Sequence, residues 1–191
     1  MPSPFSHGIA SIALGKAFSN RQMPLRFWAL SIFCSVIPDI DILGNRLGIG
    51  FWTVLGHRGL THSILFAISL SCLVVLLAFR KPIEGITRRG LLAYFFAVTI
   101  SHGILDALVN GVLGVAFFAP FNSIRYFLPW RPIHSSPIGM AFFSSTGWMV
   151  IVNELIWVWA PSLTVIFARW LFQRFADRSE PVFDEYDAVV E

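Results

Sequence analysis

Long apolar runs, separated by short polar stretches and by segments rich in glycine and proline, dominate the chain. An α-helix needs about 20 apolar residues to cross a bilayer, and residues 59–79 contain no charged side chain. Five apolar segments can be drawn, at residues 3–19, 24–43, 60–79, 90–109 and 137–172. The pattern predicts an all-α protein, an integral membrane helical bundle built from about five apolar segments.

Prolines mark where these helices should bend or stop. Pro38 predicts a kink or an end near the close of the second segment, and the fifth segment is too long for one straight span, so we expect Pro161 to divide or kink it. Residues 111–139 are rich in glycine, proline and aromatic residues. We interpret them as an interfacial or re-entrant excursion, because Tyr126 and Trp130 suit the headgroup level.

Composition agrees with a membrane protein. Hydrophobic residues make up 55% of the 191 residues and charged residues 13%, about half of the ~25% typical of soluble domains. The mean hydropathy is +0.69. These values do not fit an ordinary soluble enzyme, and 15% aromatic residues exclude intrinsic disorder of the whole chain. Cys34 and Cys72 both lie in apolar runs, so we interpret them as small buried residues.

The charges divide the chain into a body and a tail. Basic residues prevail up to Arg174, whereas the last residues are mainly acidic. This predicts one membrane-embedded domain at residues 1–174 and an acidic, disordered tail at residues 175–191. Because the basic residues lie between apolar runs instead of clustering on one solvated face, we expect no nucleic-acid partner.

Sorting the basic residues by segment predicts a topology. Alternating segments place ten of them on one face: Lys16, Arg21, Arg26, Arg80, Lys81, Arg88, Arg89, Arg169, Arg174 and Arg178. The other face carries Arg46, Arg58, Arg125 and Arg131. The positive-inside rule puts the first face and the C-terminus in the cytoplasm, so the other face is periplasmic in a bacterium.

Histidine and aspartate residues that could bind a metal lie at segment ends on the less basic face. They are His7, Asp39, Asp41, His57, His62, His102 and Asp106. His62 and Asp106 are almost equally far from Gly85 in the connecting hairpin, so regular helices would place them within about 3 Å of the same depth. An intramembrane aspartate costs about 2.5–3.5 kcal/mol near the bilayer centre, which makes such residues functional candidates.

The spacings suit a metal site. His102 and Asp106 are four residues apart and share one helix face. His57 and His62 would lie about 140° apart on a helix, so both reach one metal only if His57 stays in the preceding loop. Pro38 frees the chain to point Asp39 or Asp41 at the same centre. We favour Asp39 as the direct ligand and Asp41 as its support, or as the partner of Arg46 or Arg58.

Imidazole and carboxylate together suit Zn²⁺, with Fe or Mn as alternatives. The plainer alternative is that these groups are helix caps, interfacial hydrogen-bonding residues or one buried ion pair. The convergence of several spaced motifs at one depth favours the metal site.

Four stretches, IPDID, GHRGLTHS, SHGILD and PFNSIRYFLPWRPI, resemble the YdjM-type family of bacterial inner-membrane, metal-dependent hydrolases. The resemblance extends to about residue 172. The order His, Asp, His and then HxxxD is also similar to the ligand order of zinc-dependent phospholipase C and the related single-strand-specific nucleases. That superfamily is all-helical and cleaves phosphate esters at clustered zinc ions.

The second resemblance implies a ligand set. His7 and Asp106 would hold one metal, and its neighbour would be held by Asp39, His57 or His62, His102 and the bridging Asp106. The soluble enzymes use further ligands after HxxxD, where this chain offers only His134 and Glu154. We therefore expect one or two ions instead of three.

Catalytic roles follow if the metal binds. A metal lowers the pKa of bound water toward about 7. Asp41, or whichever of His57 and His62 does not coordinate, would act as the base. The substrate phosphate would be bound by Arg58, Arg125 and Arg131, with His134 nearby. The alternative for Arg125 and Arg131 is headgroup anchoring, and for His134 an interfacial polar role.

These expectations describe a hydrolase of the bacterial inner membrane that cleaves a phosphate ester in a lipid or lipid-linked substrate, with its site on the periplasmic side. Two other classes remain open. One is a non-catalytic membrane metal-binding or assembly protein with a closed coordination shell. The other is a transporter, which would place a polar relay near the bilayer midplane.

Overall fold

The computed structural model describes residues 1–178 apart from residues 82 and 138. Its α-helices are α1 (Pro4–Phe18), α2 (Leu25–Val36), α3 (Ile42–Arg46), α4 (Ile64–Ala78), α5 (Arg88–Ala107), α6 (Ser145–Glu154) and α7 (Ala160–Arg178). Short 3₁₀ turns occupy Ile37–Asp41, Leu60–His62 and Gly139–Phe143, and a π-helical turn occupies Leu155–Trp159. The all-helical architecture confirms the predicted fold class.

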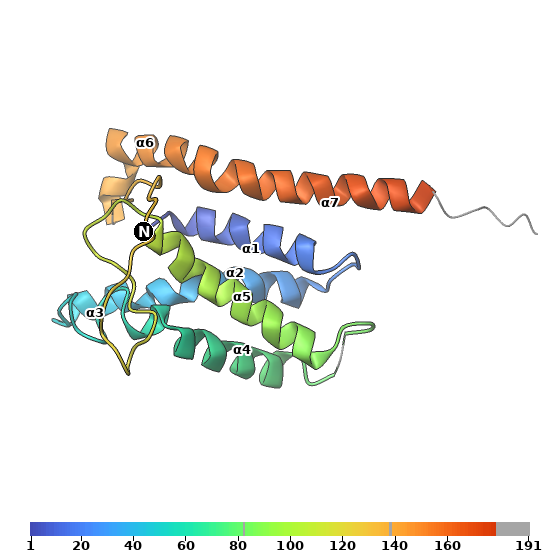
Figure 1. Ribbon diagram of the computed structural model, residues 1–191, viewed down its shortest axis with the longest axis horizontal. Helices are drawn as coiled ribbons and strands as arrows, with labels where there is room; N and C mark the ends of the chain where they lie inside the picture. Colours follow the sequence, from blue (N-terminus) through green and yellow to red (C-terminus); the bar gives the residue numbers. More distant parts are fainter. Residues whose placement is uncertain (82, 138, 179–191) are drawn as a thin grey trace, which may run out of the picture.

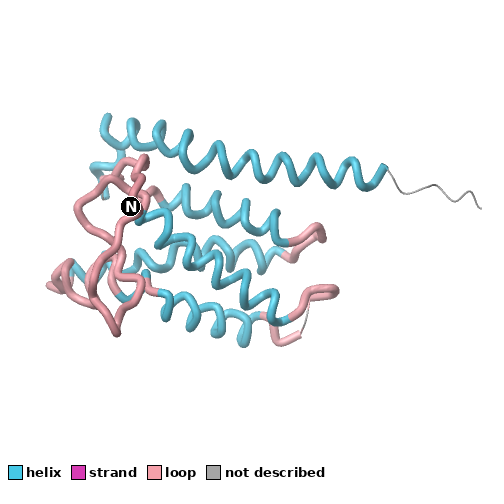
Figure 2. The backbone as a smooth tube through the Cα atoms, in the orientation of Figure 1, coloured by secondary structure: helices cyan, strands magenta, loops and turns pink. Residues whose placement is uncertain are grey.

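Helices α1, α2, α4 and α5 pack side by side as an up-and-down bundle, and α7 runs along the outside against α1 (Figure 1). Loops gather at the two ends of this bundle (Figure 2). One end carries the chain's N-terminus and the long irregular segments between α3 and α4 and between α5 and α6. The other end carries the shorter connections. The end with the long loops therefore has more chain from which a site can be built.

Three continuous helical stretches are long and apolar enough to cross a membrane: Leu25–Arg46, Arg88–Ala107 and Ser145–Phe175. Ile64–Ala78 is a shorter apolar helix, and α1 has 15 residues. All five predicted apolar segments thus form helices, and three of them meet the length of a span.

The two predicted proline effects have different outcomes. α2 ends at Val36 and Pro38 lies in the 3₁₀ turn that leads to α3, so the predicted end of the α-helix near Pro38 is confirmed. Pro161 is the second residue of α7 and does not divide the last helix, which runs on from Ser145 to Arg178. A π-helical turn at Leu155–Trp159 precedes Pro161 and interrupts the regular α-helical hydrogen-bond pattern there.

An aromatic core holds the bundle together. Phe27, Phe79, Tyr94 and Phe95 are buried between α2, α4 and α5 and contact one another in stacked and edge-on pairs. The Tyr94 hydroxyl lies 2.7 Å from the Ser31 hydroxyl on α2. Burying such rings is worth about 1.5–3 kcal/mol each, so this core fixes the helix positions on which the other end depends.

The predicted excursion is irregular in the structure. Between α5 and α6 the chain forms isolated bridges, Val109 with Ile133 and Val115 with Tyr126, and no continuous strand among its described residues. At the C-terminus, α7 continues four residues past the predicted boundary at 174. The rest of the predicted tail, residues 179–191, lies outside the described residues.

Candidate metal centre

Four chain segments meet at the loop-rich end of the bundle, and each brings predicted site residues. The first half of α1 carries His7, and the 3₁₀ turn after α2 carries Asp39. His62 ends the 3₁₀ turn before α4, where Ser63 caps the helix by accepting the Phe66 N–H. The last two turns of α5 carry the remaining pair, His102 and Asp106.

Four of these side chains face one point. Each of Asp39, His62, His102 and Asp106 offers an atom within 4.8 Å of the others. His62 Nε2 lies 3.0 Å from His102 Nε2 and 3.3 Å from Asp106 Oδ2. Asp39 Oδ1 lies 3.6 Å from His62 Nε2 and 3.4 Å from His102 Nε2. The depth predicted for His62 and Asp106 is therefore confirmed by a direct contact.

The chemistry of these donors fits a divalent cation. Both oxygens of Asp39 and of Asp106 are buried without a hydrogen-bond donor in the described chain. The Arg58 guanidinium compensates part of the Asp106 charge, with Nε 2.9 Å from Oδ2, whereas Asp39 pairs with no arginine or lysine among the described residues. A buried carboxylate without donors is costly unless a charge compensates it. Two Nε2 atoms at 3.0 Å share at most one proton between them, whereas a cation accepts a lone pair from each. Two nitrogens and two carboxylates form the mixed set that Zn²⁺ accepts.

Supporting hydrogen bonds orient both imidazoles. His102 Nδ1 lies 2.7 Å from the Ser35 carbonyl oxygen, which can only accept, so this nitrogen carries the proton and Nε2 keeps its lone pair for the centre. His62 Nδ1 lies 3.2 Å from Asp41 Oδ2 and 3.1 Å from the Thr61 hydroxyl. Such partners behind the ligands are typical of metal sites.

Asp41 lies beside the centre and supports it. Its carboxylate is 2.8 Å from His57 Nδ1 and accepts the Thr61 hydroxyl at 2.6 Å and the Arg58 N–H at 3.1 Å. Asp41, His57 and His62 also form a second group of close donor atoms. Because hydrogen-bond donors already occupy Asp41, and Asp39 has none, the geometry agrees with the expected division of roles between these two aspartates.

His57 stays in the loop before α4, as the spacing required. Arg58 takes a positive φ of 60°, rare for a residue with a side chain. A Cβ on Gly56 or Gly59 would collide with loop carbonyls, so both glycines allow this tight path. Arg58 Nε lies 2.9 Å from Asp106 Oδ2, an ion-pair contact without hydrogen-bond geometry, and its Nη1 donates to the Leu113 carbonyl.

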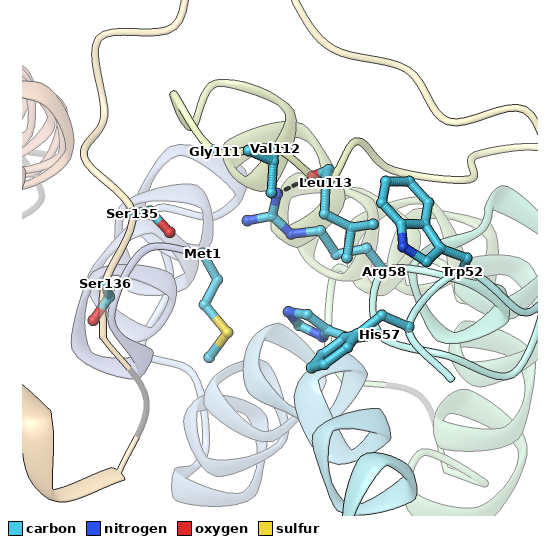
Figure 3. Close-up of a pocket in the computed structure, with 10 residues that line it drawn as sticks. Met1, Trp52, His57, Arg58, Gly111, Val112, Leu113, Ser135 and Ser136 are labelled. Atoms are coloured by element: carbon cyan, nitrogen blue, oxygen red, sulfur yellow. Dashed lines mark hydrogen bonds between the residues drawn. The ribbon is translucent and has the colours of Figure 1, made fainter. Parts of the chain in front are cut away.

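A cavity of about 280 Å³ opens beside His57 and Arg58. Figure 3 shows both side chains extending from one wall toward Met1. The remaining lining is mostly apolar and comes from Phe51, Trp52, Gly111, Val112, Leu113, Ser135 and Ser136. The cavity therefore combines one imidazole and one guanidinium with walls that suit an apolar group.

His7 stands against the centre without belonging to the four-residue group. Its ring stacks on the His102 ring with centroids 3.9 Å apart and planes 19° apart. Both ring nitrogens are buried and have no hydrogen-bond partner among the described residues. Nitrogens without a partner in the described chain are available to a cation.

Of the residues predicted to bind or neighbour the substrate, Arg58 lines the cavity, whereas Arg125, Arg131 and His134 lie outside its lining. Arg125 donates to four loop carbonyls, those of Phe51, Thr53, His57 and Gly114, at 2.7–3.2 Å. Burial of the Arg125 guanidinium lowers the pKa of this group, and the Asp41 carboxylate opposes that effect. Its hydrogen bonds thus tie two loops together instead of facing the cavity.

The other two, Arg131 and His134, are exposed. Arg131 lies over the Phe127 ring, 4.7 Å from its centroid. His134 donates its backbone N–H to the Asn153 side chain. Neither contact brings these side chains to His57 or Arg58, so a contact with substrate in this cavity has no support from their positions.

Some contacts at the candidate site could not be predicted from the residue pattern. The Ser35 carbonyl is a backbone group, and the cavity lining comes from loops without periodicity. Thr61 stands within GHRGLTHS, between two candidate ligands, and that position was a usable signal. Glu154 was considered as a spare acidic ligand, but its carboxylate reaches from the end of α6 to the start of α1, where it accepts hydrogen bonds from Ser3 and Ser6.

Comparison with known proteins gives matches over nearly the whole chain. The family described as YdjM inner membrane protein matches residues 1–178. Inner membrane protein YbcI of Escherichia coli (strain K12) is 31% identical over 176 residues, which cover 91% of this chain and 100% of that protein. No solved structure matches the chain. The similarity thus includes the helical body and every segment that carries a candidate ligand.

Proposed function

We propose that this chain, which belongs to the YdjM family of inner membrane proteins, is a membrane-bound, metal-dependent hydrolase. Its substrate would be a phosphate ester in a lipid or lipid-linked molecule. The observation that carries the proposal is the buried group Asp39, His62, His102 and Asp106, placed beside a cavity with apolar walls. Catalysis needs both a cation site and an adjoining space for substrate.

The four side chains would hold one divalent cation, with Zn²⁺ the best match and Fe or Mn as alternatives. A bound cation supplies Lewis-acid polarisation of a phosphoryl oxygen and lowers the pKa of water. His7, whose ring nitrogens have no hydrogen-bond partner among the described residues, would contribute to a second ion if one binds.

His57 is the proton acceptor in this proposal. Its Nδ1 is engaged by Asp41 at 2.8 Å, which leaves Nε2 for the cavity that the ring lines. A carboxylate that holds one imidazole nitrogen fixes the tautomer and stabilises the protonated ring, as in other acid–base catalysts.

Arg58 would bind the phosphate. One terminal nitrogen donates to the Leu113 carbonyl, and the other remains for an anionic oxygen of the substrate (Figure 3). The rings of Phe51 and Trp52 and the side chain of Val112 provide apolar contacts for the lipid part. The centre lies at helix ends, which suits the headgroup level, and we place it on the periplasmic side with the C-terminus in the cytoplasm.

A second candidate is a metal-binding protein without turnover. Four protein donors are enough to close a tetrahedral shell, and structural zinc sites have that character. The two candidates differ in whether a position near the cation stays open to water.

A hydrolysis assay on the purified protein separates them. The detergent-solubilised protein is incubated with Zn²⁺ and with phosphatidic acid, phosphatidylglycerol or a soluble phosphodiester, and products are identified by mass spectrometry. We expect cleavage that stops with a chelator and returns with Zn²⁺. His57→Gln should lower kcat by about 10²-fold or more with unchanged metal content, whereas Arg131→Ala should keep full activity. Bound metal without cleavage of any of these esters would favour the non-catalytic candidate.

A further inference from the structure

Glu154, the last residue of α6, is a buried carboxylate outside the candidate site. It is 1% exposed, and its partners all lie at the start of α1. Oε1 accepts the Ser3 N–H at 2.6 Å, and Oε2 accepts the Ser6 hydroxyl at 2.6 Å together with the Ser3 hydroxyl. One side chain thus joins the C-terminal helix to the first turn of a helix about 150 residues earlier.

The arrangement replaces the usual cap of α1. Ser3 is the N-cap residue, yet its hydroxyl makes no capping bond within α1 and goes to Glu154 instead. The first turn of α1 contains no acidic residue of its own. Negative charge near a helix N-terminus is favourable, so Glu154 provides from another helix what the local sequence lacks.

The π-helical turn explains how two side chains reach the same hydroxyl. Trp159 Nε1 donates to the Ser6 hydroxyl at 2.8 Å, and this hydroxyl also donates to Glu154. Residues five apart lie about 140° apart on an α-helix, but the i→i+5 pattern of a π turn brings them to one side. Leu155–Trp159 is such a turn and directly follows Glu154.

His7 depends on this first turn more than the other site residues do. Its backbone N–H bonds the Ser3 carbonyl at 3.3 Å, so it follows the residue that Glu154 holds. Its ring has no hydrogen-bond partner in the described chain and only stacks on His102. The position of the α1 backbone therefore sets where the His7 nitrogens lie.

We propose that Glu154 is a positioning residue that clamps the start of α1, through Ser3 and Ser6, and thereby holds the His7 ring beside the metal centre. The importance of His7 rests on the proposed function. The clamp itself can be tested without any metal.

The test measures the reactivity of each histidine toward diethyl pyrocarbonate in the chelator-treated full chain, read by peptide mass spectrometry. Exposed His134 is the internal reference for full reactivity. In the wild-type protein we expect His7, His62 and His102 to be protected, because all three are buried. In Glu154→Ala, His7 should react at least about tenfold faster than in wild type, while the other two stay protected.

Two variants complete the comparison. Glu154→Gln should keep the protection of His7, since an amide still accepts from Ser3 and can donate to a hydroxyl. Asn153→Ala is the matched control, because it removes bonds from α6 to Pro132 and His134 and leaves α1 alone. An unchanged His7 in Glu154→Ala would overturn the proposal. Simultaneous exposure of all three histidines would also overturn it, since Glu154 would then only maintain the fold.

Metal content provides the second readout and separates this proposal from the proposed function. If the wild-type chain binds two ions, Glu154→Ala should lose the one next to His7 and keep the other. If the wild-type chain binds no ion, the proposed function fails, while selective exposure of His7 would still support the clamp.

Discussion

Asp39 and Asp41 are two residues apart, and their surroundings assign them different tasks. The oxygens of Asp39 lie near two imidazole nitrogens and accept no hydrogen bond from the described residues. Those of Asp41 accept from Thr61 and the Arg58 backbone and pair with His57. A carboxylate without donors is free for a cation, whereas one already surrounded by donors orients its neighbours.

This difference predicts unequal effects of two matched substitutions. Asp39→Asn should abolish tight zinc binding, because the amide removes a charged ligand. Asp41→Asn should keep the ion but weaken its affinity by about 10–100-fold, the usual effect of losing a partner behind a ligand. Competition titration with a chelator measures both affinities. Equal losses in the two variants would contradict the assignment.

At the residue scale, spacing predicted some of the centre and packing determined the rest. The HxxxD spacing predicted that His102 and Asp106 share one helix face. Because His57 and His62 would lie about 140° apart on a helix, the spacing also required His57 to stay in the preceding loop if both were to reach one metal. The choice between Asp39 and Asp41 depends on a 3₁₀ turn, whose geometry the residue pattern does not specify. The bonds of Glu154 depend on contact between the two ends of the chain, so spacing alone could not reveal them.

At the scale of elements, the loop that carries His57 is held by a distant arginine. Arg125 reaches the carbonyls of Phe51, Thr53 and His57 from the irregular segment after α5. Arg131 belongs to the same segment but is exposed over Phe127. The two arginines therefore form a natural pair for comparison.

We predict that Arg125→Ala lowers hydrolysis roughly 10–100-fold with little change in metal content, because the loop that carries His57 loses its anchors. Arg131→Ala should leave both quantities unchanged. Kinetics and metal analysis of the two variants test this. If metal content falls as steeply as activity in Arg125→Ala, the role of Arg125 extends beyond that loop.

Two glycines of α1 allow a test of helix packing. A Cβ on Gly15 would come within 2.6 Å of the Trp28 ring and 2.9 Å of the Tyr94 hydroxyl, whereas one on Gly8 would meet only Ile32 at 3.9 Å. Of these two glycines, Gly15 is therefore the one at which α1 approaches its neighbours more closely.

We predict that Gly15→Ala destabilises the protein by about 1–3 kcal/mol through overpacking. Gly8→Ala should be neutral or stabilise by up to about 1 kcal/mol, because alanine favours the helix. Thermal unfolding in detergent gives the comparison. Equal melting temperatures for the two variants would contradict the predicted packing of α1.

The apolar pattern predicted which segments form helices, and α2 ends just before Pro38 as expected. Pro161 was expected to divide or kink the last segment, and the helical run continues past it, with a π-helical turn at Leu155–Trp159. The π turn brings Glu154 and Trp159 to the Ser6 hydroxyl of α1. Because this contact joins segments far apart in the sequence, the local residue pattern could not predict the turn.

At the scale of the whole molecule, the two ends of the bundle differ in their residues. The candidate metal centre lies at the end with the long loops, together with Arg58 and Arg125, whereas Arg21 and Arg80 lie in connections at the other end, where Arg88 begins α5 (Figure 1). Apolar segments and basic residues were enough to predict this polarity. The cavity was not predictable, because loops without periodicity build it.

This polarity predicts the orientation in the membrane. A fluorescent reporter fused to the C-terminus should fold in the cytoplasm, and a cysteine introduced by Ser136→Cys should react with a membrane-impermeant thiol reagent from the periplasm. Ser136 lines the cavity, so its labelling reports the side of the site directly. A periplasmic C-terminus would overturn the orientation.

If Asp39, His62, His102 and Asp106 hold a metal ion, removing one of them should lower the metal content of the purified protein. His102→Ala and Asp106→Ala each remove one ligand, and His134→Ala removes an exposed histidine as the control. We predict one or two divalent ions per chain in the wild type and the control, and a clear loss in both ligand variants. The same metal content in all four proteins would contradict the account.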